Sequence, residues 1–215
     1  MRVLGIDEAG RGPVIGPLVM CGYLIDEKKL KKLKKLGVKD SKQLTPKRRE
    51  NLAPKLKKLS DDFILLKLSA KDIDKLRTTT NLNKLEIERM HHMIDLLEPD
   101  KVIIDALEQE KRFYSKIASA HNGIEMIIEN FADRNYIEVA AASVIAKVHR
   151  DRDMKRLHDK YSLGTGYCSD PKTISFLKDW IKKNKEFPDF VRKSWITAQC
   201  IKSEKEQSSL MRWRS

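Results

Sequence analysis

Four acidic residues close short apolar runs of the chain and are candidates for metal-assisted chemistry. They are Asp7, Glu8, Asp105 and Asp133. Each run predicts a buried strand, so we expect a sheet to gather the carboxylates. Crowded carboxylates repel one another. Mg²⁺ or Mn²⁺ would offset that repulsion, because both ions accept oxygen ligands. Two such ions about 4 Å apart can bind a scissile phosphate between them. For each acid taken singly, a helix cap or surface turn is the commoner role.

A glycine-rich turn follows the first two acids. Gly10, Arg11 and Gly12 come directly after the first predicted strand and its Ala9. The turn is not a P-loop, because no Gly-Lys-Ser/Thr follows, and it lacks the spacing of a dinucleotide-binding fingerprint. An ordinary tight turn is the alternative interpretation of these three residues.

The charge of the chain is strongly positive. Its 215 residues include 44 Lys and Arg against 31 Asp and Glu, a formal net charge of +13. Such an excess favours a polyanionic partner, because each cation placed near a phosphate releases a counterion. A heavily charged, solubilising surface of the kind found in heat-adapted proteins is an equally good explanation from charge alone. A basic protein that coats nucleic acid without cutting it therefore stays open as an alternative to a nuclease.

The pattern of apolar residues predicts an α/β fold. Three successive strands followed by alternating helices and strands favour a mixed sheet flanked by helices. After about residue 187 the pattern is all-helical. We therefore expect a catalytic domain at 1–187 and a C-terminal helical extension with a basic tail at 188–215. The predicted strands are 3–8, 15–25, 63–68, 101–107 and 124–133, and the predicted helices are 30–36, 46–59, 82–97, 108–120, 137–160, 171–184 and 189–203.

The cysteines and the hydropathy pattern exclude several classes of protein. Cys21, Cys168 and Cys200 are odd in number and far apart, so they predict neither a zinc site nor a disulfide framework. No run of about 18 apolar residues occurs, and the N-terminus lacks the apolar core of a signal peptide. We expect a soluble, cytoplasmic protein that does not bind membranes.

Five motifs occur in an order that resembles the type 2 ribonucleases H (ribonuclease HII), most closely the single-chain archaeal enzymes. The resemblance extends from Gly5 to about Trp195. One departure is Cys168, which stands where the family usually has proline. The motifs are GIDEAGRGP at 5–13, DSKQL at 40–44, VIIDAL at 102–107, ADRNY at 132–136 followed by AAASVIAKVHRDR at 140–152, and GTGYCSDP at 164–171.

The resemblance implies both a fold and a reaction. The fold is ribonuclease H-like, with a mixed five-stranded sheet. The activity is an endonuclease that hydrolyses the RNA strand of RNA–DNA hybrids and nicks DNA 5′ of embedded ribonucleotides, leaving 3′-hydroxyl and 5′-phosphate ends. A divalent metal, Mg²⁺ or Mn²⁺, is the implied cofactor, and a monomer is the implied state. A nuclease of the same broad fold that cuts branched DNA is a further alternative.

The resemblance also implies roles for individual residues. The four acids match the metal-binding and catalytic positions. The backbone of Gly10, Arg11 and Gly12 matches the element that recognises the 2′-hydroxyl, and Tyr167 matches a tyrosine that packs against the neighbouring sugar. From charge and position alone, three C-terminal cations are further candidates for backbone contacts, and Trp195 is expected to anchor the C-terminal helices. The implied phosphate contacts are Lys42, Ser143 and Lys147, and the C-terminal cations are Arg192, Lys193 and Lys202.

Overall fold

The chain was studied as a computed structural model, which describes residues 1–38, 44–107 and 109–213, with the backbone alone for 208–213. Its contacts divide the chain into two compact units. The expected division at residue 187 stays a prediction about domain organisation. The first unit consists of Met1–Ala9, Val19–Lys67 and Asn81–Asp151, and the second of Gly10–Leu18, Leu68–Thr80 and Arg152–Ser215.

A mixed sheet forms the centre of the first unit. Its strand order is β3-β2-β1-β4-β5, with β1 antiparallel to β2 and parallel to β4, and with β4 parallel to β5. This arrangement confirms the predicted five-stranded α/β fold. The strands are β1 (Arg2–Ala9), β2 (Leu18–Asp26), β3 (Asp62–Leu68), β4 (Lys101–Asp105) and β5 (Glu125–Glu129).

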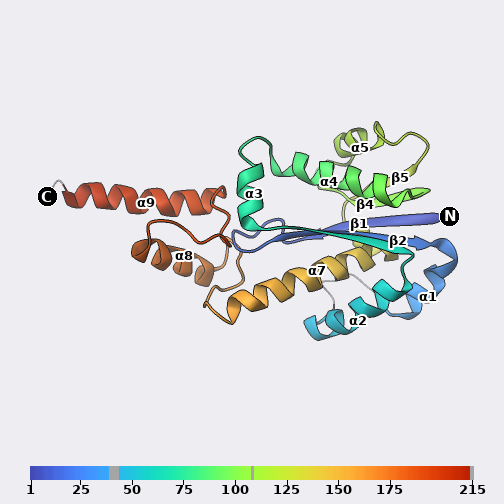
Figure 1. Cartoon of the computed structure of the whole chain (residues 1–215), viewed down its shortest axis with the longest axis horizontal. Helices are drawn as coiled ribbons and strands as arrows, with labels where there is room; N and C mark the ends of the chain where they lie inside the picture. The colour runs from blue at the N-terminus through green and yellow to red at the C-terminus, as the bar shows by residue number, and fades with distance from the viewer. Residues whose placement is uncertain (39–43, 108, 214–215) are drawn as a thin grey trace. The chain divides into compact units, whose positions relative to one another are not determined.

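Helices of the first unit cover both faces of this sheet (Figure 1). On one face, side chains of α1, α2 and α7 form a hydrophobic core with β2. On the other face lies α4, whose Met93 and Leu97 approach Gly22 of β2. The helices are α1 (Leu30–Lys35), α2 (Pro46–Leu59), α4 (Leu82–Leu97), α5 (Glu110–Ala118), α6 (Ala132–Asn135) and α7 (Ile137–His158), the last of which continues into the second unit.

The start of α7 crosses β1 at very short range. A Cβ atom built on Gly5 would lie 2.5 Å from the carbonyl carbon of Glu138 and 2.6 Å from the backbone nitrogen of Val139. Only glycine leaves room for backbone at this distance. Further along α7 the buried side chains are small, which keeps the helix close to the sheet; they are Ala140, Ala141, Ala142 and Ala146.

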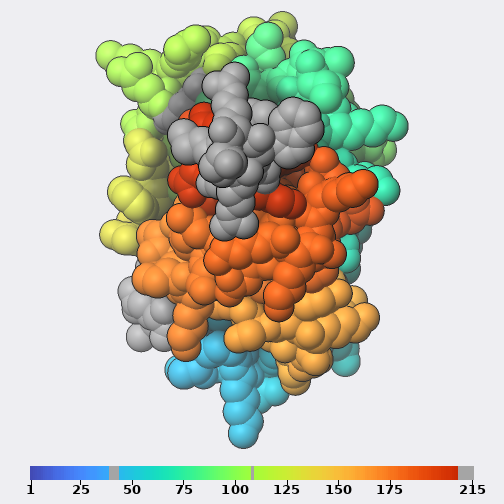
Figure 2. Space-filling view, turned by 90° about the vertical axis from the view of Figure 1, so that its left-hand side faces the viewer, coloured from blue at the N-terminus to red at the C-terminus, as the bar shows by residue number. Residues whose placement is uncertain are grey.

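The second unit has its own core, formed by α8, α9 and the residues around them. An isolated β-bridge pairs Ile15 with Val191. The outer surface of the segment that includes α8 is the orange region of Figure 2. The helices of this unit are α3 (Ala70–Leu76), α8 (Pro171–Lys183) and α9 (Ile196–Trp213).

One helix of the structure was not predicted, and two predicted elements have different bounds. Helix α3 was not predicted, although Ser69 and Asp72 form a capping box at its start. The helix expected at 189–203 begins only at Ile196. The strand expected at 124–133 ends at Glu129, and Asp133 lies instead in the short helix α6. Within the described part of the chain, no helix is long and apolar enough to cross a membrane.

Candidate active site

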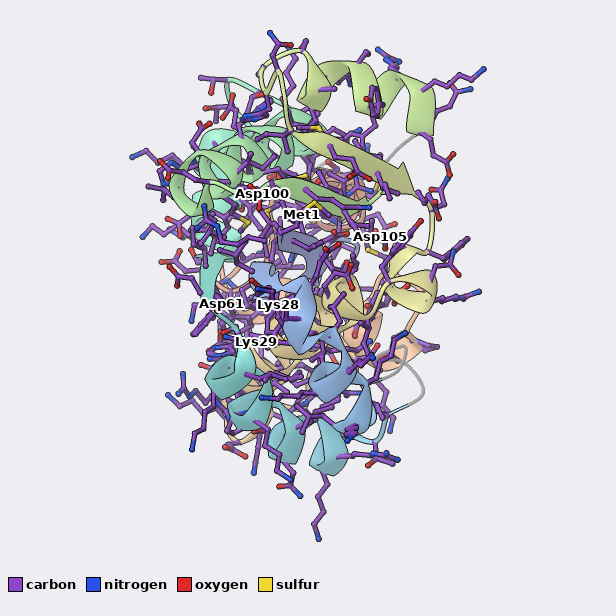
Figure 3. All side chains as sticks on the ribbon, turned by 90° about the vertical axis from the view of Figure 1, so that its right-hand side faces the viewer. Met1, Lys28, Lys29, Asp61, Asp100 and Asp105 are labelled. Atoms are coloured by element: carbon purple, nitrogen blue, oxygen red, sulfur yellow. The ribbon has the colours of Figure 1, made fainter. Side chains whose placement is uncertain are left out.

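The sheet register brings two of the four acids to neighbouring positions. Ile6 of β1 pairs with Ile104 of β4 in a parallel register. Asp7 and Asp105 are the next residues on these two strands, so they lie side by side at the same end of the sheet. Asp7 is buried, with 4% of its surface exposed, and Asp105 is half-buried. Figure 3 shows Asp105 well apart from the surface ion pair of Lys29 and Asp61, whose charged atoms are 2.5 Å apart.

Two hydrogen bonds donated by backbone amides connect the third segment to the end of β4. The amide of Ala132 donates to Oδ1 of Asp105 over 3.0 Å, and the amide of Ala106 donates to the carbonyl of Glu129 over 3.0 Å. Asp133 is the next residue after Ala132 and is itself buried, with 4% exposed. The loop between β5 and α6 therefore holds Asp133 close to the end of β4.

The pKa of Asp7 indicates that these carboxylates interact electrostatically. Its pKa is raised from 3.8 to about 7, mainly by burial and then by the negative charges of Asp105 and Asp133. A hydrogen bond from the side chain of Ser143 and one from the amide of Glu8 oppose the increase. Three of the four predicted acids thus share one electrostatic environment.

Glu8 occupies a different position from the other three acids. It follows Asp7 on the same strand, and the Cβ atoms of consecutive strand residues point to opposite faces. Asp7 faces α7, where Ser143 lies, so Glu8 begins on the opposite face. Its Oε2 atom is nevertheless shielded from solvent, as is Oδ1 of Asp133.

The donor set at this site fits a hard divalent cation. Among the described residues, no three His, Cys, Asp or Glu side chains are arranged tightly enough to hold a metal as they stand. The acids consist of oxygen donors alone, which Mg²⁺ and Mn²⁺ prefer. The raised pKa of Asp7 marks a concentration of negative charge that a bound cation would relieve.

The same pKa predicts how the metal-free protein responds to pH. Between about pH 4 and 7 the folded protein binds a proton at Asp7 that the unfolded chain has lost, so stability falls as pH rises. At pH 8 in chelator, we expect the free energy of unfolding of Asp7→Asn to be about 2 kcal/mol higher than that of the unchanged protein. The advantage should shrink at pH 5. Urea unfolding of both proteins at the two pH values measures this, and an Asp7→Asn protein less stable at pH 8 would contradict it.

The predicted recognition residues of the second unit lie together. Gly12 is exposed, and a Cβ built on it would lie 3.8 Å from Cε1 of Tyr167. The side chain of Tyr167 is 44% exposed. The amides of Val14 and Ile15 donate to the carbonyl of Gly166, over 2.9 and 3.2 Å. The glycine turn and the loop that carries Tyr167 therefore form one continuous surface.

The predicted backbone contacts have mixed outcomes. Lys42 lies outside the described residues. Ser143 is buried, and its hydrogen bond goes to Asp7, so a phosphate contact through it stays a prediction. Lys147 is half-buried on α7, and its role likewise stays a prediction. Lys202 forms an ion pair with Glu186 at 2.5 Å.

Arg192 is the residue whose position differs most from expectation. It was a candidate for surface contact with nucleic acid, but its side chain is completely buried. Its guanidinium donates to the carbonyl oxygens of Gly10, Arg11 and Gly16. Trp195, expected to anchor helices, donates from Nε1 to the carbonyl of Gly12 over 3.1 Å. Both residues therefore donate hydrogen bonds to backbone carbonyls of the glycine turn.

Comparison with known proteins decides the family. The model of the family described as Ribonuclease HII matches residues 4–198. The chain belongs to the ribonuclease HII family. As a ribonuclease HII, it is a ribonuclease H, a hydrolase that acts on RNA paired with DNA.

Individual relatives agree with this assignment over nearly their whole length. The ribonuclease HII of Thermococcus sibiricus is 46% identical, over 98% of this chain and 97% of its own. The crystal structure of ribonuclease H2 from Pyrococcus horikoshii is 44% identical with a TM-score of 0.87, covering 95% of this chain and 98% of that one. A ribonuclease HII of Archaeoglobus fulgidus, solved in complex with PCNA, is 38% identical with a TM-score of 0.81, covering 91% and 95%.

Proposed function

We propose that this ribonuclease HII cuts by two-metal-ion hydrolysis, on the 5′ side of a ribonucleotide, and leaves 3′-hydroxyl and 5′-phosphate ends. The observation that carries the proposal is the position of three acids: adjacent strand ends hold Asp7 and Asp105, and the loop before α6 holds Asp133 beside them. The raised pKa of Asp7 agrees with this grouping. A buried group of carboxylates has little use in a protein that only binds a polyanion. The same group suits a site where cations and a phosphate meet.

Each acid has a separate part in this proposal. Asp7 and Asp105 would be the central metal ligands, because adjacent parallel strands hold them at one end of the sheet. Glu8 and Asp133 would complete the ligand set and orient water. The two Mg²⁺ or Mn²⁺ ions supply activation of water and stabilisation of the departing 3′ oxygen. The hydrogen bond from Ser143 favours the ionised form of Asp7 and opposes the increase in its pKa.

Recognition in this proposal depends on the ribose. The 2′-hydroxyl separates RNA from DNA as both a donor and an acceptor. Gly10, Arg11 and Gly12 would meet it with their backbone, where two glycines remove side-chain bulk. The exposed ring of Tyr167 would pack against the adjacent sugar. Basic side chains, including Lys42 and Lys147, would bind phosphates without regard to sequence. The enzyme acts as a monomer on hybrids and on DNA that contains ribonucleotides.

A duplex with one embedded ribonucleotide tests the proposed function. With Mg²⁺ or Mn²⁺ present, we expect one nick on the 5′ side of the ribonucleotide, and none after addition of chelator. A 5′-phosphate is then detected by ligation of the product with a suitable partner strand. The all-DNA duplex of the same sequence and a branched DNA serve as controls, and both should stay intact. Cutting of the branched DNA alone would indicate the other class of nuclease, and binding without cutting would indicate a coating protein.

A further inference from the structure

Arg192 forms an unusual set of contacts for a buried cation. Its side chain is 0% exposed, and three of its donor hydrogen bonds go to backbone carbonyl groups. Nε donates to Gly16 O over 3.0 Å, one terminal nitrogen donates to Arg11 O over 2.8 Å, and the other donates to Gly10 O over 2.5 Å. Burying a guanidinium costs several kcal/mol unless its donors are used. The protein therefore depends on these carbonyl groups staying in place.

Trp195 extends the same arrangement. Its ring lies 4.7 Å from the centre of the Arg192 guanidinium, and its Nε1 donates to the carbonyl of Gly12. The guanidinium of Arg77 also lies 4.8 Å from the ring. We call Arg192 and Trp195 together the carbonyl clamp. The clamp holds the carbonyl oxygens of all three residues of the glycine turn.

The segment that carries the clamp is itself anchored. Oδ2 of Asp74 accepts from the amide of Lys193 over 2.7 Å, and its Oδ1 accepts from the amide of Ser194 over 3.0 Å. The hydroxyl of Ser194 donates to the same Oδ1 atom over 2.6 Å. The amide of Arg192 donates to the carbonyl of Val14 over 2.8 Å. These hydrogen bonds connect the segment that carries the clamp both to α3 and to the residues directly after the glycine turn.

The orientation of the carbonyls determines the orientation of the amides. In a planar trans peptide the C=O and N–H groups point in opposite directions. Because the clamp holds the carbonyls of Gly10 and Arg11, the N–H groups of Arg11 and Gly12 point away from Arg192. The next peptide has no N–H, because residue 13 is proline. Gly12 is exposed beside Tyr167, so its N–H belongs to the surface proposed to meet the ribose.

We propose that Arg192 and Trp195 are positioning residues for ribose recognition. Arg192 holds the two peptides whose N–H groups belong to Arg11 and Gly12, and Trp195 holds the carbonyl of Gly12 at the end of the turn, so that these amides are presented to the 2′-hydroxyl. The inference rests on the proposed function of the glycine turn. Neither side chain needs to touch the nucleic acid. The clamp should therefore control the preference for ribonucleotide over deoxyribonucleotide more than it controls general affinity for a duplex.

Trp195→Phe tests this inference with little disturbance of packing. Phenylalanine keeps an aromatic ring against Arg192 and removes the hydrogen bond to Gly12, with some loss of packing that the Trp180→Phe control shares. Trp180→Phe is a matched control, because Nε1 of Trp180 donates to the carbonyl of Glu186 over 3.0 Å, away from the glycine turn. The readout is the ratio of affinities for a duplex with one ribonucleotide and for the all-DNA duplex. It is measured by fluorescence anisotropy in proteins that also carry Asp7→Asn.

We expect Trp195→Phe to lower this ratio roughly 5-fold, the equivalent of one hydrogen bond, with Trp180→Phe unchanged. Arg192→Lys keeps the charge but loses the forked geometry, and should lower the ratio more, roughly 10-fold or beyond. The ratio does not depend on the fraction of folded protein, because unfolded molecules lower the apparent affinity for both duplexes by the same factor. A merely structural role would lower both affinities equally and leave the ratio intact.

Two results separate failure of this inference from failure of the proposed function. Cutting of the one-ribonucleotide duplex by the unchanged protein tests the function by itself. If that duplex is cut, but Trp195→Phe and Arg192→Lys both keep the full ribonucleotide preference, the clamp does not position the turn. If Trp180→Phe lowers the ratio as much as Trp195→Phe does, the effect is general to the second unit, and the inference is again overturned.

Discussion

Asp7→Asn should abolish cutting while leaving hybrid binding almost unchanged. The substitution removes one buried negative charge from a site where Asp105 and Asp133 already raise the pKa of Asp7. Losing a central metal ligand should cost about 4 kcal/mol of transition-state stabilisation, which is roughly a 1,000-fold loss in rate. Binding should stay equal or become slightly tighter, because less negative charge opposes the phosphate. Single-turnover cutting of a labelled hybrid and anisotropy titration measure the two effects.

Asp61→Asn is the matched control for that experiment. It makes the same chemical change at a surface ion pair with Lys29, which Figure 3 places apart from Asp105. We expect its cutting rate to stay within about twofold of the unchanged protein, since exposed ion pairs contribute little. Substantial cutting by Asp7→Asn would overturn the assignment of Asp7 as a metal ligand. Loss of binding together with cutting would instead point to misfolding.

Gly5→Ala should destabilise the protein by at least about 3 kcal/mol, although it adds one methyl group. The added Cβ would meet backbone atoms of Glu138 and Val139 within 2.6 Å, and no side-chain rotation relieves contact with backbone. Helix α7 would have to move away from β1. Ser143 lies on that helix and Asp7 on that strand, so the hydrogen bond between them should also weaken. Urea unfolding measures the loss of stability, and activity per folded molecule should fall with it.

Gly12→Ala provides the opposite case. A Cβ there has open space, with Cε1 of Tyr167 at 3.8 Å, and Gly12 does not have a left-handed backbone. We expect its stability to stay within about 1 kcal/mol of the unchanged protein. Its cutting should still fall, because the methyl group stands on the proposed ribose surface. Equal stability of Gly5→Ala and Gly12→Ala would contradict the close approach of α7.

Periodicity predicted the parts of the fold whose residues bury one face. The helix at α4 has a regular series of apolar residues, and β1 and β4 are short apolar runs that end in acids. Register between β1 and β4 follows from that pattern, so Asp7 and Asp105 could be placed together from the sequence. Asp133 was predicted at the end of a fifth strand, but the strand ends at Glu129 and Asp133 lies in α6. The chain turns at Phe131, whose φ of 61° ends the strand conformation before Asp133.

The role of Arg192 could not be predicted from local pattern. A lone arginine in a lysine-rich chain predicts a solvated side chain, because buried arginines are rare. Its acceptors are the carbonyls of Gly10, Arg11 and Gly16, which are remote in sequence. The one local signal is Trp195 three residues later, an aromatic neighbour suited to a guanidinium. Every residue has a backbone carbonyl, so the residue types do not indicate which carbonyls will bind the guanidinium. The interaction is therefore identified only from the structure.

The central place of β1 in the sheet has a consequence for biosynthesis. The first strand to leave the ribosome pairs with β4, about a hundred residues later, and closing so long a loop is entropically costly. It also packs against α7, which is made later still. Asp7 therefore acquires its acidic neighbours only when most of the polypeptide has emerged. A nascent chain that stops before Asp133 would carry three of the four acids proposed to bind metal, and it would lack the fourth.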